Sequence, residues 1–221
     1  METVTAFRSK TQTLSRPIIF IGHSLGGLLI KEALLLPRRK FGETKHTISR
    51  ATFGILFFGV PNHGLRNEQL RTPVDGQPNE AFINDLLVDD DSEASDFLKR
   101  LTAQFAESFQ GYYHIVTFYE RLLSLTLEPN KTGGWSKTGG RCLMVTEQSA
   151  TNTGMVATAD EDKIPINADH SGIVKFSSRN DVGYFVVQER LRQLVEETKQ
   201  QVSQRFAESD LYSPSSETHR A

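Results

Sequence analysis

"RPIIFIGHSLGGLLIKEALLLP", residues 16–37, passes from one secondary-structure pattern to another within a few residues. The apolar run Pro17–Ile21 is typical of a short, buried β-strand. After a glycine-rich turn, apolar residues recur at helical spacing over Leu25–Leu36, and Pro37 is expected to end that helix. We therefore expect a strand, a sharp turn with Ser24 at its corner, and a helix.

The turn, Gly22–Gly26, has the sequence Gly-His-Ser-Leu-Gly and fits the pattern G-x-S-x-G. In a nucleophile elbow of this type, a strained turn exposes the serine hydroxyl above the edge of a sheet. Ser24 would be the nucleophile, and Gly22 and Gly26 would be small because a Cβ there would clash with the strand or helix. The amide of Leu25, at the positive end of the helix, would bind an oxyanion. The alternative is a glycine-rich turn whose serine only caps the helix.

Strands and helices alternate along the rest of the chain. Strands are expected within 51–64, 113–120 and 141–146, and helices within 93–110 and 181–203. The polar segment 65–92 is expected to be a surface excursion, and 129–140 a flexible loop. Short apolar strands that alternate with helices predict an α/β fold with a parallel sheet covered on both faces.

Three regions are expected along the chain. Residues 1–16 are the remnant of a lead-in helix, 17–205 form the domain, and 206–221 form a polar, disordered tail.

A serine hydroxyl needs a base, and the base needs an acid to orient it. After an elbow of this type the partners follow in the order Ser, acid, His, on loops at the carboxyl ends of later strands. His170, between the expected fourth strand and the last helix, fits the base. The other histidines fit the base less well. His23 lies inside the elbow, His63 lies too early in the chain, and His114 lies within an expected strand. His46 is in a basic surface stretch and His219 is in the tail.

The acid has several candidates. Glu120 ends the strand "IVTFYE", where its carboxylate would project from the same sheet edge as Ser24. Asp160 is the alternative acid, followed by Asp162 and Asp169. Asp169 directly precedes His170, so its side chain is expected to point away from the imidazole.

Composition limits the function further. The 221 residues carry a net charge of -2, which argues against nucleic acid as a partner. Cys142 is the only cysteine, so neither a disulfide framework nor a thiolate metal cluster is expected, and we expect no cofactor and no metal. No apolar run has the roughly 18 residues of a membrane span. A cytoplasmic location is expected.

Five segments in order carry a family resemblance: "PIIFIGHSLGGLLIKEAL", "FGILFFGVPNHG", "VTFYE", "VTEQSAT" and "ADHSGIVKF". They resemble the landmarks of α/β-hydrolase domains, in particular lipase-like serine esterases, which also occur at the N-terminus of fungal NACHT and NB-ARC proteins. The resemblance implies hydrolysis of carboxylic esters, including lipids, by a triad of Ser24, Glu120 and His170. It also admits mitochondrial or endoplasmic-reticulum membrane association, with peripheral membrane contact.

The resemblance also implies strands and helices before the elbow, one of which ends in a His-Gly loop that supplies a second oxyanion amide. Only sixteen residues precede Pro17 here. We therefore expect a partial α/β-hydrolase fold that self-associates through an exposed sheet edge and turns over slowly. The competing function is a hydrolase-derived signalling or interaction domain with weak or no activity.

Overall fold

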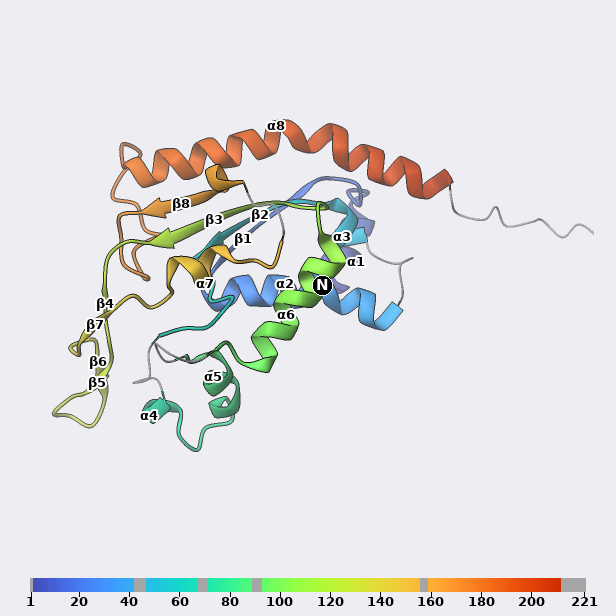
Figure 1. Cartoon of the computed structure of the whole chain (residues 1–221). Coiled ribbons are helices and arrows are strands. Elements are labelled where there is room, and N and C mark those ends of the chain that lie inside the picture. Colours follow the sequence, from blue (N-terminus) through green and yellow to red (C-terminus); the bar gives the residue numbers. More distant parts are fainter. Residues whose placement is uncertain (1, 42–46, 67–70, 89–92, 156–158, 212–221) are drawn as a thin grey trace, which may run out of the picture.

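A four-stranded parallel sheet forms the centre of the molecule (Figure 1). A computed structural model of the chain describes residues 2–41, 47–66, 71–88, 93–155 and 159–211. The sheet has the order β1 (Ile18–His23), β2 (Thr52–Phe58), β3 (His114–Glu120) and β8 (Lys163–Ile166). Every neighbouring pair in it is parallel. The expected α/β fold class is therefore confirmed.

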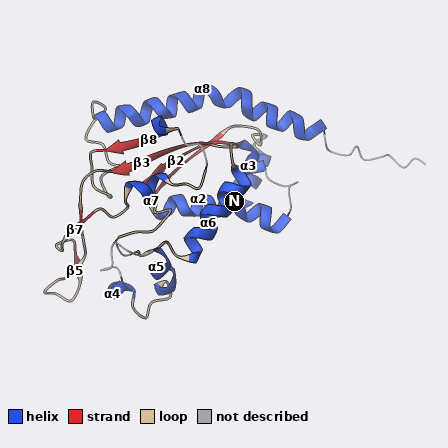
Figure 2. Ribbon diagram, in the orientation of Figure 1, coloured by secondary structure: helices blue, strands red, loops and turns tan. Residues whose placement is uncertain are grey.

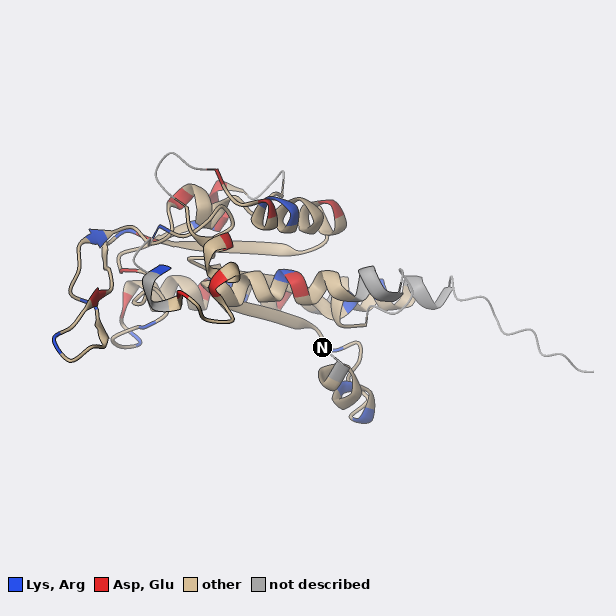
Figure 3. Ribbon diagram, turned by 90° about the horizontal axis from the view of Figure 1, so that it is seen from below, with Lys and Arg blue, Asp and Glu red and all other residues tan. Residues whose placement is uncertain are grey.

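Helices cover both faces of this sheet (Figure 2). On one face lie α2 (Leu25–Phe41) and α6 (Asp96–Phe109), and on the other lies α8 (Val182–Leu211). The shorter helices are α1 (Glu2–Lys10), α3 (Thr47–Ala51), α4 (Arg71–Val74), α5 (Glu80–Leu86) and α7 (Glu147–Thr151). A 3₁₀ turn, Asp160–Asp162, precedes β8. Lys and Arg are interspersed with Asp and Glu along the ribbon, in keeping with the small net charge (Figure 3).

Strand β2 shows why the core forms where it does. All seven of its residues are buried. Its side chains alternate, so that Ile55 and Phe57 pack with α2 and α6 while Leu56 and Phe58 pack under α8. A strand with apolar residues on both sides is stable only between two covering layers, and the apolar run 53–58 of β2 dictates that central place.

Strand β1 differs from β2. It lies at the edge of the sheet, where β2 is its one strand partner among the described residues. Of its six residues only Gly22 is buried, and Ile21 is 57% exposed. The expectation of a fully buried first strand was therefore wrong, because an edge strand lacks a neighbouring strand, and the packing around that strand, on one of its two sides.

Two small antiparallel ladders extend beyond the carboxyl ends of the parallel strands (Figure 1). They pair β4 (Ser124–Leu125) with β7 (Arg141–Cys142) and β5 (Glu128–Pro129) with β6 (Trp135–Ser136). The expected fourth strand, 141–146, supplies only β7, and β8 takes its place in the sheet. Val145 is instead buried beside β3, where its amide binds Glu120.

Three further features differ from the expectation. α2 continues past Pro37 to Phe41, because the loss of one backbone donor does not outweigh the packing of Leu34 and Leu35 in the core. α8 continues to Leu211, beyond the expected boundary of the tail at 205, and 212–221 lie outside the described residues. The segment 65–92 also contributes more than a polar excursion, since Leu65 and Leu86 are buried.

None of the helices within the described ranges is both long enough and apolar enough to cross a bilayer.

Candidate active site

Ser24 occupies the corner between β1 and α2 in a strained conformation. Its φ angle is 51°, in the left-handed region that a non-glycine residue rarely adopts. Its amide donates to the carbonyl of Phe58 at 2.9 Å, and its carbonyl accepts from the amide of Gly27 at 3.0 Å. The turn is therefore tied both to β2 and to the first turn of α2, which holds the strain in place.

The steric demand of the elbow falls on two glycines. A Cβ on Gly22 would lie 2.7 Å from Cδ1 of Ile30 and 2.9 Å from the backbone of Gly27. A Cβ on Gly27 would lie 2.1 Å from a methyl of Val60. At Gly26, in contrast, no described residue outside its own helix lies within 4 Å of the position that a Cβ would take. The expectation that Gly26 must be small for this contact was wrong, because the phase of α2 turns Gly27 toward Val60.

A line of hydrogen bonds connects three side chains from distant parts of the chain. Nε2 of His170 lies 3.0 Å from Oγ of Ser24, and Nδ1 of His170 lies 2.6 Å from Oε2 of Glu120. Ser24 follows β1, Glu120 ends β3, and His170 lies in the loop after β8. These are the three residues that the sequence predicts for a triad, and the fold brings them together at one edge of the sheet.

The carboxylate of Glu120 is completely enclosed, with 0% of its side chain exposed. A buried carboxylate is costly unless its oxygens are hydrogen-bonded. One oxygen accepts from Nδ1–H of His170, and the other accepts from the amide of Val145 at 3.1 Å. The Val145 amide therefore fixes which oxygen of Glu120 faces the imidazole.

Two further residues hold the backbone of His170. Its amide donates to Oγ of Ser124 at 3.1 Å, and its carbonyl lies 2.9 Å from Nε2 of His23. Because the carbonyl can only accept, Nε2 of His23 carries the proton. Burial keeps the pKa of His23 below its usual value, which favours the neutral ring. Neither contact was predicted from the sequence, since no local pattern connects Ser124 or the elbow histidine to residue 170.

The other acidic candidates lie elsewhere. Asp160 is fully exposed and pairs with Lys163 at 2.9 Å. Asp162 lies near His114, at 3.5 Å, at the amino end of β8. Oδ1 of Asp169 accepts from the amide of Gly172 at 2.7 Å.

The other histidines are also accounted for. His114 begins β3 at the opposite end of the sheet, and its pKa is raised by the hydrogen bond with Asp162. His63 lines a separate polar cavity. His46 and His219 lie outside the described residues.

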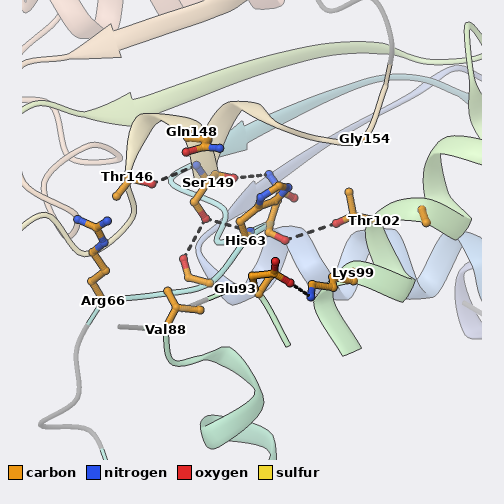
Figure 4. Close-up of a pocket in the computed structure, with 14 residues that line it drawn as sticks. His63, Arg66, Val88, Glu93, Lys99, Thr102, Thr146, Gln148, Ser149 and Gly154 are labelled. Atoms are coloured by element: carbon orange, nitrogen blue, oxygen red, sulfur yellow. Dashed lines mark hydrogen bonds and ion pairs between the residues drawn. The ribbon is translucent and has the colours of Figure 1, made fainter. Parts of the chain in front are cut away.

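That polar cavity, about 670 Å³ in volume, lies beside the turn after β2 (Figure 4). His63, Thr102, Ser149 and the ion pair between Glu93 and Lys99 are among the groups that line it. Ser149 accepts from the amide of His63 at 3.0 Å, so the cavity wall is fixed to α7. Neither Ser24 nor His170 lines this space.

A buried lysine supports the loops around the site. Lys31 of α2 has an exposed fraction of 0%. Its Nζ donates to Oδ1 of Asn62 at 2.6 Å and lies 5.3 Å from the ring centre of Phe105. Nδ2 of Asn62 in turn donates to the carbonyls of Ser149 and Ala150. Lys31 and Asn62 thus join α2 and the turn after β2 to α7.

Burial lowers the pKa of Lys31 from 10.5 to about 7. Between these two values the unfolded chain keeps a proton that the folded chain has released, so stability should rise with pH, by up to about 1.4 kcal/mol per pH unit. Below pH 7 the Lys31 amine is charged in both the folded and the unfolded state, so the full cost of burying the charge lowers the stability. Urea unfolding at pH 6, 7.5 and 9 should show this rise, and Lys31→Met should remove it. An equal pH dependence in both proteins would contradict the prediction.

Comparison with known proteins identifies distant relatives. Protein SERAC1 of Homo sapiens is 29% identical over 161 residues, which are 72% of this chain and 21% of SERAC1. SERAC1 of Bos taurus is 28% identical over 161 residues, with the same 72% and 21% shares. SERAC1 of Mus musculus is 45% identical over 51 residues, which are 23% of this chain and 8% of that protein. No family model and no solved structure matches the chain.

The chain spans about a fifth of the length of the human and bovine relatives. The similarity to SERAC1 and the parallel sheet flanked by helices fit a hydrolase-like α/β fold.

Proposed function

We propose that this chain is a serine hydrolase that cleaves carboxylic esters, with Ser24 as the nucleophile, His170 as the base and Glu120 as the acid that orients it. One observation carries the proposal: His170 hydrogen-bonds Ser24 at 3.0 Å through Nε2 and Glu120 at 2.6 Å through Nδ1. The positive φ of Ser24 supports it independently, because a serine that only capped a helix would have no need of a strained backbone.

The reaction would begin with proton transfer. Nε2 of His170 takes the proton of Ser24 Oγ while Oγ forms a bond to the ester carbonyl carbon. The carbonyl oxygen becomes an oxyanion near the amide of Leu25. As the first residue of α2, Leu25 has an N–H without a partner inside the helix. Glu120 stabilises the positive charge that His170 carries at this stage.

The intermediate then collapses. The carbon–oxygen bond to the alcohol breaks, and His170 gives its proton to the departing oxygen. Ser24 is left acylated. A water molecule then attacks the acyl carbon while His170 takes one of its protons. The bond between this carbon and Oγ of Ser24 breaks, His170 returns the proton to Oγ, and the carboxylic acid leaves. His170 gives one proton to the alcohol and the other to Ser24. The chain is therefore unchanged after the reaction, and the ester and water are the reactants it needs.

The test is covalent labelling of the full chain with a fluorophosphonate, which phosphonylates activated serines. We expect stoichiometric label on the peptide that contains Ser24, no label after unfolding in urea, and hydrolysis of p-nitrophenyl butanoate that stops on labelling. A folded protein that takes no label and hydrolyses no ester would overturn the proposal. That outcome would favour the alternative, a hydrolase-derived signalling or interaction domain.

A further inference from the structure

A second, apolar cavity of about 210 Å³ opens directly beside the triad. Ser24, Leu25 and His170 line part of it. Its other walls are aliphatic or thioether side chains: Leu65, Ile83, Leu86, Leu87 and Met144. Apart from Ser24 and His170, none of the side chains that line this space carries a hydrogen-bonding oxygen or nitrogen.

The wall between the two cavities is built from a pair of extended segments. Leu65 bridges Leu87 in parallel, with the amide of Leu65 donating to Leu86 at 2.7 Å and the amide of Val88 donating to Leu65 at 3.1 Å. Neighbouring residues of an extended segment point to opposite sides. Leu65 and Leu87 accordingly line the apolar cavity, while Arg66 and Val88 line the polar one.

Ile83 lines this space from α5. The helix contacts α6, and Ile83 packs partly against the main core and partly against the cluster that contains Leu65 and Leu87. Its neighbour Phe82 is exposed and packs edge-on against Phe97 instead of lining the cavity. Two adjacent residues of α5 thus differ: Ile83 lines the apolar cavity and Phe82 does not.

The size of the cavity limits what it can hold. An apolar cavity of about 150 Å³ accommodates a six-carbon ring. By proportion, 210 Å³ accommodates roughly eight carbons. An apolar chain is the fitting occupant, because a polar group there would lose its water partners without replacement.

The chain that fits best is the acyl chain of the ester. The acyl group stays bonded to Ser24 after the alcohol has left, so it gains from an adjacent apolar cavity in both halves of the reaction. The alcohol, in contrast, must depart once His170 has protonated it.

We propose that this cavity binds the acyl chain of the substrate, that it favours medium-length chains of roughly eight carbons, and that Ile83 sets the limit of length. The inference rests on the proposed ester hydrolysis and adds the class of acyl group. With each methylene from butanoate to octanoate, kcat/KM should rise by up to about fourfold, the gain from transferring one methylene out of water. Beyond octanoate it should fall.

The test compares p-nitrophenyl butanoate, octanoate, dodecanoate and hexadecanoate on the full chain and two Ile83 variants. Ile83→Ala removes three carbons and should move the optimum to about ten or eleven carbons, and Ile83→Phe should move it toward butanoate. Phe82→Ala, on the same helix, is the matched control and should keep the octanoate optimum. Thermal melting shows whether each variant folds. If Ile83→Phe does not fold, Ile83→Ala alone suffices for the test.

Two further measurements separate the outcomes. Labelling rates with ethyl, octyl and hexadecyl fluorophosphonates report chain preference without turnover, and acetate esters of matching alcohols test the leaving group. The acyl-cavity inference is wrong, while the hydrolase proposal stands, if Ser24 is labelled but kcat/KM does not depend on the length of the acyl chain. The same holds if kcat/KM depends on the alcohol instead, or if Ile83→Ala leaves the preferred chain length unchanged. Absence of labelling and of hydrolysis with every ester would overturn the hydrolase proposal itself, and the acyl-cavity inference with it.

Discussion

Glu120→Gln is expected to lower kcat/KM for ester hydrolysis by about four orders of magnitude while the fold persists, the loss known for the isosteric change in a serine protease triad. The reason lies in the Val145 amide, which donates to Oε1 of Glu120. In the variant this donor holds the amide oxygen of Gln at that position, so the NH₂ group must face Nδ1 of His170. The imidazole would then carry its proton on Nε2, where it can no longer accept one from Ser24.

The measurement needs a background rate and a control. Ser24→Ala gives the background rate of the hydrolysis assay, because it removes the attacking oxygen. Asp160→Asn is the matched control: its side chain is fully exposed and pairs with Lys163, and activity should stay within about twofold of the parent. If Asp160→Asn removed activity and Glu120→Gln did not, the acid would have to be reassigned. Far-UV circular dichroism of each variant checks that the fold has survived.

Gly27→Val should have the largest effect on stability. Its Cβ would lie 2.1 Å from a methyl of Val60, and Gly27 cannot retreat without moving Ser24, because its amide donates to the carbonyl of Ser24. Overpacking of this kind costs about 1–3 kcal/mol and occasionally more. Because the γ-methyls of valine add further overlap, we expect at least the upper end of that range, or failure to fold, in urea unfolding experiments.

Gly26→Ala is the matched comparison and should change stability in the opposite direction. Nothing in the described structure outside α2 meets a Cβ there, and alanine is favoured over glycine within a helix by about 1 kcal/mol. Gly27→Ala combined with Val60→Ala should recover part of the loss of Gly27→Ala alone. If Gly26→Ala destabilised the protein as much as Gly27→Ala, the close contact between α2 and the segment after β2 would not be at Gly27.

The sequence predicts those parts of the molecule whose signals are local. The strand around Leu56 contains an uninterrupted apolar run, and the strand around Val116 is apolar from Ile115 to Tyr119 except for Thr117. The helix around Phe105 repeats apolar residues four apart, so each element follows from its sequence pattern. Ser24, Glu120 and His170 were likewise found from their places after successive elements. What these residues do in catalysis stays a prediction until it is measured.

The parts that sequence did not predict depend on contacts between distant segments. β8 has only four residues, one of them Pro165, so its pattern is too short to distinguish from a loop. Leu65 and Leu87 lie in polar stretches, and their pairing across 22 residues has no periodic signature. The importance of Gly27 over Gly26 depends on how α2 is rotated against Val60, which a glycine-rich motif cannot specify.

The wide separation of the site residues along the chain has a consequence for how the protein folds. His170 is 146 residues from Ser24 and 50 from Glu120, and the parallel strands that carry them are joined by crossovers, not hairpins. Contacts of such high sequence separation form slowly, because the entropy of closing each loop is spent before the contact forms. α8, a 30-residue helix held by local hydrogen bonds, can form early in refolding. Helical signal should therefore return well before catalytic activity, which has to wait until β8 docks against β3.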